Sequence, residues 1–209
     1  MNATIVPPDG TGFDALIFDW DGTLVDSTEV CFRALSDSLA DSGVFLDPDW
    51  YWPRQAIASP DLLRSWEQEF GTLPESIDKI IHRCRRYVIE AAPLLQVIEP
   101  IASIARLANG RGQEVAIGSN ASSDVVVAGL QATGLDAVVD KVATWSDVAT
   151  GRGKPAPDIF LLAAQMMGAD RGRCLVYEDS EAGINAALQA GMTVCDVASG
   201  VVRQPAEAR

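Results

Sequence analysis

Three short apolar runs along the chain each end abruptly at a polar residue. They are residues 15–18 before Asp19, residues 115–118 before Ser119, and residues 174–177 before Glu178. Apolar runs of this length, bounded by turn residues, are typical of strands buried in a parallel sheet. In such sheets, ligands bind just beyond the carboxyl ends of the strands. The pattern therefore predicts that hydroxyl and carboxylate groups from three separate segments meet at one edge of a sheet.

The spacing of apolar residues divides the chain into two kinds of segment. Between about residues 27 and 93 the spacing is helical, and helices are predicted from about 28 to 41, from Ser59 onward and from Pro74 onward. After about residue 94, helices alternate with strands: the helices are expected near 98–108, 124–133, 158–167 and 180–190, and further strands near 137–143 and 193–197. This alternation predicts an α/β fold with a doubly wound parallel sheet. The helical segment 27–93 is then an insertion into a core formed by residues 1–26 and 94–209.

Length and charge narrow the class of protein. A chain of 209 residues favours one domain, or one domain with a small insertion. The net charge of -13 argues against nucleic acid and anionic membranes as partners, because both attract a positive surface. No apolar stretch approaches the ~20 residues of a membrane span, and residues 1–11 lack the basic and apolar segments of a signal peptide. We therefore expect a cytoplasmic protein that is a monomer, with a dimer as the alternative.

Cysteine and histidine are few and scattered. The four cysteines form no C-x-x-C pair, and His82 is the single histidine. A zinc cluster is therefore not expected. The cysteines are predicted to be reduced and mostly buried.

Asp19 and Asp21 lie two residues apart, directly after the first apolar run. At strand spacing, alternate side chains point to the same side, so both carboxylates can converge on one site. Two close carboxylates repel each other unless one is protonated or a cation lies between them; with Glu178 and Asp179 nearby, they suit Mg²⁺, which takes oxygen ligands. Asp19 could then act as a nucleophile and Asp21 as a general acid and base. A loop calcium site or a solvated turn is the alternative, although the further ligands of an EF-hand loop are missing.

Two other segments carry groups that could bind an anion. Ser119-Asn120 lies between a strand and a helix, where a hydroxyl and backbone N–H groups form an anion site, with a simple helix cap as the alternative. Lys154 lies in a loop fixed by Pro155 and Pro157, and it could neutralise a phosphate and a nucleophilic aspartate together. Its alternative is a surface lysine in a turn. The acidic pair after the third run could instead stabilise the N-terminus of the following helix.

Taken together, these motifs resemble, in order and spacing, the four signature motifs of the haloacid dehalogenase superfamily. They are Asp19-x-Asp21-Gly22-Thr23, Ser119, Lys154-Pro155-x-Pro157-Asp158 and Glu178-Asp179. The resemblance extends from about residue 13 to 197. It implies a Rossmann-like core, an all-helical cap inserted after the first motif, and Mg²⁺-dependent phosphoryl transfer through an aspartyl-phosphate. Within the superfamily, the chain is similar to the branch with a small helical cap, which includes β-phosphoglucomutases and fructose-1-phosphate and 6-phosphogluconate phosphatases.

The resemblance also implies a role for each motif residue. Asp19 would be the nucleophile and Asp21 the acid and base. The metal site would be formed by Asp19, the backbone carbonyl of Asp21, and Asp179, with Glu178 binding directly or through water. The phosphoryl group would be held by Ser119, Asn120 and Lys154.

One departure from the branch bears on the choice between phosphatase and mutase. Its hexose-phosphate mutases carry a cap histidine ten residues after the second aspartate, and here that position is Cys31. This favours transfer of the phosphoryl group to water. We therefore expect a phosphatase acting on a small phosphorylated metabolite, a sugar phosphate or sugar-acid phosphate, with a sugar phosphomutase or a phosphoglycolate-type phosphatase as the alternatives. A phosphoacceptor signalling domain is disfavoured, because such domains lack the helical insertion.

Substrate specificity is expected in the helical segment, since a closing cap excludes water and orients the substrate. Arg54 and Ser59 lie where the cap of such enzymes would face the core. Further candidates for contact with the leaving group are Arg33, Arg64, Arg83, Arg85 and Arg86. A solvated helix face is the alternative for all five, and it is favoured for the last three.

Overall fold

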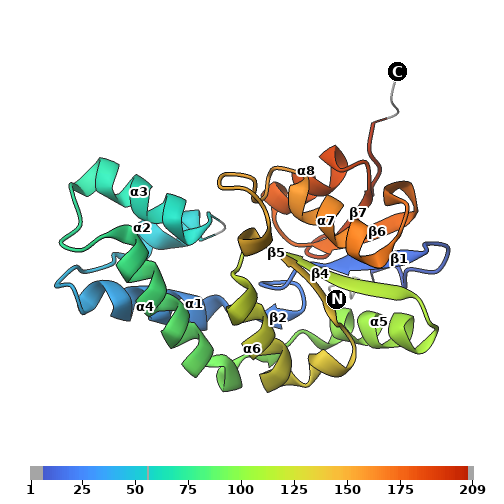
Figure 1. The fold of residues 1–209 in the computed structure, drawn as a ribbon, viewed down its shortest axis with the longest axis horizontal. Helices are drawn as coiled ribbons and strands as arrows, with labels where there is room; N and C mark the ends of the chain where they lie inside the picture. The colour runs from blue at the N-terminus through green and yellow to red at the C-terminus, as the bar shows by residue number, and fades with distance from the viewer. Residues whose placement is uncertain (1–6, 56, 207–209) are drawn as a thin grey trace, which may run out of the picture.

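A six-stranded sheet in the order β5-β4-β1-β6-β7-β8 forms the centre of the molecule (Figure 1). The computed structural model describes residues 7–55 and 57–206, so positions 1–6, 56 and 207–209 of the predicted segments lie outside the described residues. The strands are β1 (Ala15–Phe18), β4 (Glu114–Ser119), β5 (Lys141–Thr144), β6 (Cys174–Glu178), β7 (Thr193–Asp196) and β8 (Val202–Arg203). Neighbouring strands are parallel except β7 and β8. The predicted α/β fold with a parallel sheet is confirmed.

The strand order reverses around β1, which pairs with β4 on one side and β6 on the other. Phe18, at the end of β1, lies opposite Ile117 of β4 and Tyr177 of β6. The three strands therefore end at the same level. The predicted meeting of three polar strand ends at one edge is confirmed, and it lies where the topology of open α/β sheets puts ligands.

Helices cover both faces of the sheet (Figure 1). One face packs against α5 (Glu99–Gly110) and α6 (Ser123–Thr133), and the other against α7 (Asp158–Met167) and α8 (Glu181–Gln189). Alternate residues of β1 serve the two faces: Leu16 and Phe18 join the first cluster, and Ala15 and Ile17 join the second. Burial of a large apolar side chain stabilises the fold by roughly 1.5–3 kcal/mol. Packing on both faces therefore fixes β1 and the polar residues that follow it.

Four helices lie between two short strands that pair antiparallel, β2 (Val25–Asp26) and β3 (Gln96–Val97). They are α1 (Thr28–Ala40), α2 (Pro48–Tyr51), α3 (Ser59–Phe70) and α4 (Ile77–Glu90). Their buried side chains form a hydrophobic cluster separate from the two clusters at the sheet. In Figure 1 they stand to the left of the sheet and its covering helices. The β2–β3 pair brings the two ends of this helical segment together at its base.

Some element boundaries differ from the sequence prediction. The helix expected from Pro74 begins at Ile77, because the Ser76 side chain caps it by accepting the Lys79 N–H at 3.4 Å. The strand expected near 137–143 is β5, because residues 135–137 form a 3₁₀ turn. Further 3₁₀ turns are Trp52–Arg54, Ala92–Leu94, Trp145–Asp147 and Arg171–Arg173. The two-residue strands β3 and β8 were not predicted, since two residues carry no periodicity.

Two sequence expectations concern burial and membranes. All four cysteines are free; Cys84, Cys174 and Cys195 are buried and Cys31 is half-buried, as predicted. Among the helices of residues 7–55 and 57–206, none combines the length and the apolar character needed to cross a bilayer.

Arg83 of α4 ties this helix to α1 and to the loop before α4. Its guanidinium donates to the Ser38 carbonyl at 3.1 Å, to the Ser42 hydroxyl at 2.6 Å and to the Glu75 carboxylate at 2.8 Å. Only 15% of the side chain is exposed. Because hydrogen bonds to a charged group contribute about 1.5–3 kcal/mol, Arg83 is a structural residue of the helical segment.

Replacing Arg83 by methionine should lower the free energy of unfolding by about 1–3 kcal/mol, because the Ser38 carbonyl loses its charged donor. Arg86→Met is the matched control: Arg86 is exposed and its ion pair with Glu90 spans 3.8 Å, so the change should stay within about 0.5 kcal/mol. Urea unfolding followed by tryptophan fluorescence measures both variants. Equal losses in the two variants would contradict the structural role of Arg83.

Candidate active site

The turn after β1 carries two aspartates. Asp19 continues β1, donates its backbone N–H to the Tyr177 carbonyl at 2.9 Å, and is 7% exposed. Gly22 then adopts a φ of 79°, which favours glycine because other residues are strained there. A Cβ atom at Gly22 would also clash with the Asp179 carboxylate. The glycine therefore lets the turn after β1 approach the residue that follows β6.

Lys154 bridges two of the acidic strand ends. Its Nζ lies 2.6 Å from Asp19 Oδ1 and 2.6 Å from Glu178 Oε2, and its side chain is 3% exposed. Asn120 holds the Lys154 backbone: Oδ1 accepts the Lys154 N–H at 2.8 Å, and Nδ2 donates to the Lys154 carbonyl at 3.3 Å. Asn120, predicted to contact phosphate, thus clamps the loop that positions the lysine.

Glu178 lies fully buried at the end of β6. Its Oε1 accepts the Ser180 N–H at 3.0 Å, the Ser180 hydroxyl at 2.9 Å and the Asp179 N–H at 3.2 Å, while Oε2 faces Lys154. Gly183, in the first turn of α8, lies so close that a Cβ atom would clash with the Glu178 carboxylate. Both oxygens of Glu178 therefore have donors, and the carboxylate directs Lys154 toward Asp19.

Hydroxyl groups contact the remaining acidic residues. Ser27 donates to Asp21 Oδ1, and Thr23 donates to Asp179 Oδ1 at 3.2 Å. Ser119, 1% exposed at the end of β4, accepts a backbone N–H from two residues onward at 3.0 Å. This leaves its own O–H available to donate into the site.

Sequence analysis did not single out Thr23 or Ser27 as partners of the acidic residues. Both are buried, with exposures of 0% and 4%, in the segment between β1 and α1. The sequence pattern that could have indicated them is two hydroxyl residues that follow Asp19 and Asp21 within a few positions. Only the folded turn shows which carboxylate each of them meets.

The cluster holds more negative than positive charge. Burial raises the pKa of Asp19 well above its usual value, the Glu178 carboxylate adds to the rise, and the Lys154 ammonium opposes it. Burial also raises the pKa of Asp21, although the hydrogen bond from the Ser27 hydroxyl acts in the opposite direction. Burial and the nearby Glu178 carboxylate together raise the pKa of Asp179 to about 6. Burial disfavours the charge on Lys154, but the ion pairs with Asp19 and Glu178 outweigh it and raise the pKa of the ammonium.

The charge and chemistry of these groups fit a divalent cation. Asp19, Glu178 and Asp179 each place a carboxylate oxygen within 4.8 Å of the other two. A single ammonium does not balance three carboxylates, and an added cation would relieve their repulsion. Carboxylate oxygens are the ligands that hard cations such as Mg²⁺ prefer. Since Glu178 already has a donor on each oxygen, Asp19 and Asp179 are better placed as direct ligands.

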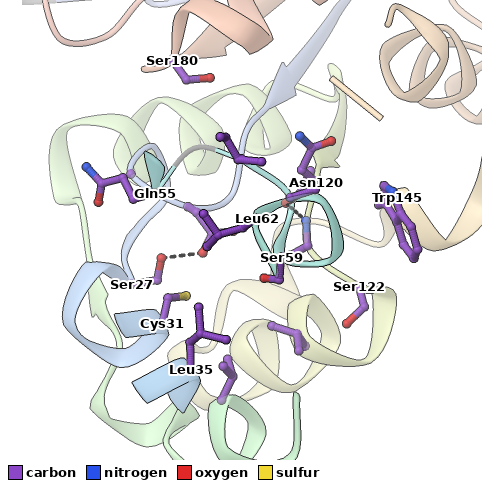
Figure 2. A pocket seen from close by; sticks show the side chains of 18 of the residues that line it. Ser27, Cys31, Leu35, Gln55, Ser59, Leu62, Asn120, Ser122, Trp145 and Ser180 are labelled. Carbon is purple, nitrogen blue, oxygen red and sulfur yellow. Dashed lines mark hydrogen bonds between the residues drawn. The ribbon is translucent and has the colours of Figure 1, made fainter. Parts of the chain in front are cut away.

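A cavity of about 500 Å³ opens between this cluster and the helical segment. Figure 2 shows side chains from both sides converging on it, among them Ser27, Cys31, Ser59 and Asn120. The predicted site residues that line it are Asp19, Asp21, Ser59, Ser119, Asn120, Lys154 and Asp179. Arg54 does not line it: its guanidinium lies 4.7 Å from the centre of the Trp50 ring and donates to the Trp50 carbonyl at 2.9 Å. The predicted role of Arg54 in specificity stays a prediction.

Known proteins are similar to this chain in both sequence and fold. The family model for haloacid dehalogenase-like hydrolases matches residues 13–191. The chain is 32% identical over 189 residues to fructose-1-phosphate phosphatase YqaB of Escherichia coli (strain K12), covering 88% of this chain and 96% of the relative. It is 30% identical over 195 residues to protein CbbY of Rhodobacter capsulatus, covering 86% and 83%. In fold, it matches a mutant of CbbY from Rhodobacter sphaeroides solved with xylulose-(1,5)bisphosphate, with a TM-score of 0.80 at 24% identity over 87% of this chain and 84% of the other.

The close approach of α8 to Glu178 generates a prediction about Gly183. Gly183→Ala should lower the free energy of unfolding by about 1–3 kcal/mol, because the new methyl group displaces a carboxylate held by several donors. Gly172→Ala is the control, since a Cβ there would meet only Asp170 Oδ1, at 3.6 Å. Urea unfolding of both variants measures the difference. If the Gly183→Ala variant is no less stable than the Gly172→Ala variant, the close contact between Gly183 and the Glu178 carboxylate is contradicted.

Proposed function

This chain belongs to the haloacid dehalogenase-like hydrolases and is a phosphoric monoester hydrolase, and we propose that it hydrolyses a small sugar phosphate or sugar-acid phosphate. The reaction would proceed through an aspartyl-phosphate on Asp19 and depend on Mg²⁺. One observation carries the proposal: Asp19, at the end of the central strand, faces the cavity with an oxygen 2.6 Å from the Lys154 ammonium. A carboxylate so held is oriented for attack and needs no base to activate it.

In the first step, an Asp19 oxygen attacks the phosphorus of the ester. The bond between phosphorus and the leaving oxygen breaks, and the protonated Asp21 carboxyl gives its proton to that oxygen, so the alcohol leaves neutral. The raised pKa of Asp21 supports this role, because it favours the protonated form that a general acid needs. The Ser27 hydroxyl at Asp21 Oδ1 would orient the carboxyl.

In the second step, the Asp21 carboxylate takes a proton from water as the water oxygen attacks the phosphorus. The bond between phosphorus and Asp19 breaks, which restores both carboxyl groups and releases inorganic phosphate. Charge on the transferred group would be met by Lys154 and by the hydroxyl of Ser119, which line the same cavity. Such positioned donors supply most of the stabilisation in phosphoryl transfer.

Mg²⁺ would be held by the carboxylates of Asp19 and Asp179 and by the backbone carbonyl of Asp21. Glu178, which pairs with Lys154, would bind the cation directly or through water. When bound, the cation supplies positive charge that neutralises the phosphate oxygens and keeps Asp19 ionised. The acidic cluster around Asp19, Glu178 and Asp179 supports this assignment.

Residues 27–93 would act as a cap domain over a core formed by residues 1–26 and 94–209. The cavity between the helical segment and the strand ends supports this division, because it would enclose the substrate and exclude bulk water. Ser59 lies on the wall that the cap contributes.

Cys31 supports a phosphatase rather than a mutase. It lines the cavity from α1, and burial raises the pKa of its thiol. A thiol that stays protonated cannot serve as the titrating imidazole that mutases of this branch carry at this position. Transfer of the phosphoryl group to water is therefore the proposed outcome.

Asp19→Asn should lower phosphate release from sugar phosphates by about a thousandfold or more, because an amide is not a nucleophile at phosphorus. Release of inorganic phosphate in the presence of Mg²⁺ is the measurement, and circular dichroism checks the fold. Asp14→Asn is the matched control: Asp14 is exposed and pairs with Arg173 at 2.7 Å at the other end of β1. Full activity in the Asp19 variant would overturn the mechanism.

Removal of divalent cations should lower activity by at least about a hundredfold, because the acidic cluster would repel the phosphate dianion. The assay compares the enzyme in excess chelator with the same sample after Mg²⁺ is added back. Undiminished activity in excess chelator would rule out the proposed metal.

A further inference from the structure

The charged groups on the wall of the cavity are unevenly distributed. Asp19, Asp21, Asp179 and Lys154 gather at the strand ends, where the proposed chemistry takes place, and Glu181 lines the cavity next to them at the start of α8. On the helical side, the cavity is lined mainly by apolar and hydroxyl side chains, and among the residues that the structure describes there, the one charged residue is Arg85 of α4. A single cation thus faces the part of the cavity away from the acidic cluster.

Arg85 differs from its neighbours on the same helix. Arg83 is engaged by Ser38, Ser42 and Glu75, and Arg86 pairs with Glu90. Among residues 7–55 and 57–206, no carboxylate lies within ion-pair distance of Arg85 and no group accepts a hydrogen bond from it, although its side chain is partly buried. The five donors of its guanidinium are therefore available to water or to a ligand that enters the cavity. An anionic ligand in the cavity would satisfy them.

One residue on the wall of the same cavity has an unsatisfied polar group. The Ser122 hydroxyl is inaccessible and has no hydrogen-bond partner within the part of the chain that the structure describes, and the residue is 7% exposed. It occupies the N-cap position of α6 without making the usual cap bond, and α6 packs against α4. Figure 2 shows Ser122 on the wall of the cavity opposite Ser180. The start of a helix favours negative charge, so the N-terminus of α6 would add to the attraction for an anion in the cavity.

We propose that Arg85 binds a second anionic group, a carboxylate or a second phosphate, on the leaving group of the substrate. The inference rests on the proposed phosphatase function and narrows its substrate class to sugar-acid phosphates or sugar bisphosphates. Arg85 is then a specificity residue: it holds the end of the substrate that does not react, while Asp19 attacks at the other end. Arginine suits this task, because its planar fork binds carboxylate or phosphate with two hydrogen bonds.

Two matched pairs of esters test the substrate class. One pair is 6-phosphogluconate and glucitol 6-phosphate, which differ by a carboxylate; the other is fructose 1,6-bisphosphate and fructose 1-phosphate, which differ by a phosphate. The wild-type enzyme should prefer the more anionic member of at least one pair by about ten- to a hundredfold in kcat/KM. The pair that shows the preference identifies which anion Arg85 binds.

Variants of α4 test the residue. Arg85→Met should raise KM for the preferred ester by about ten- to a hundredfold and change kcat less than KM. The ratio of kcat/KM between the two members of the pair should then fall close to one. Arg85→Lys, which keeps the charge but loses the fork, should restore part of the preference. Arg86→Met, next along the helix, should leave the ratio as in the wild type.

The outcomes separate this inference from the function on which it rests. Hydrolysis of the less anionic member of each pair as fast as the more anionic one, or an equal effect of Arg85→Met on both members of a pair, overturns the role of Arg85 and leaves the phosphatase standing. The role of Arg85 is also overturned if Arg86→Met loses the preference for the more anionic ester as fully as Arg85→Met does. If none of the four esters is hydrolysed, while circular dichroism shows a folded protein, the sugar-phosphate function itself fails.

Discussion

The ammonium of Lys154 between the carboxylates of Asp19 and Glu178 is the interaction on which the rest of the site depends. Its Nζ lies 2.6 Å from an oxygen of each, in a place almost closed to solvent. Without the cation, two carboxylates would face each other in a medium of low dielectric constant, and breaking a buried pair costs about 3–5 kcal/mol. The surrounding contacts keep the lysine there: Asn120 clamps its backbone, and the Ser180 N–H and hydroxyl fix the far side of Glu178.

The order of the strands makes this interaction possible. With β4 and β6 on either side of β1, Asp19 and Glu178 stand at the ends of neighbouring strands and share the Lys154 ammonium, although they lie 159 positions apart along the chain. Lys154 comes from outside the sheet and lies over the Phe160 ring, with Nζ 4.8 Å from its centre. Gly118 leaves room for that ring, since a Cβ atom there would lie 2.8 Å from it. Because Gly118 of β4 has no side chain, the Phe160 ring fits against the sheet and supports the Lys154 ammonium beside β1.

The sequence was sufficient to predict the strand ends, because a buried strand that stops at a carboxylate is a local pattern. It was not sufficient for contacts that depend on the direction of a side chain. Arg83, Arg85 and Arg86 carry the same charge within one turn of α4, yet the first is bonded to α1, the second lines the cavity and the third is exposed. Successive residues of a helix point about 100° apart, so a shift of one position changes the environment completely. The same limit applies to Asn120, whose amide meets a loop 34 positions away.

The distribution of charge in the cavity separates the reaction from the choice of substrate. In the proposed mechanism the acidic cluster and Lys154 contact the phosphoryl group, which all phosphate monoesters share, so they do not distinguish one alcohol from another. The part of the helical wall that the structure describes has few charged groups, and a low dielectric constant strengthens the interactions of each of them. One guanidinium there can discriminate more strongly than several exposed charges, because a ligand that fails to pair with it leaves a partly buried cation unsatisfied. Since the strand ends and α4 belong to separate hydrophobic clusters, substitutions on the helical wall can change the substrate without disturbing the packing that holds Asp19 and Lys154.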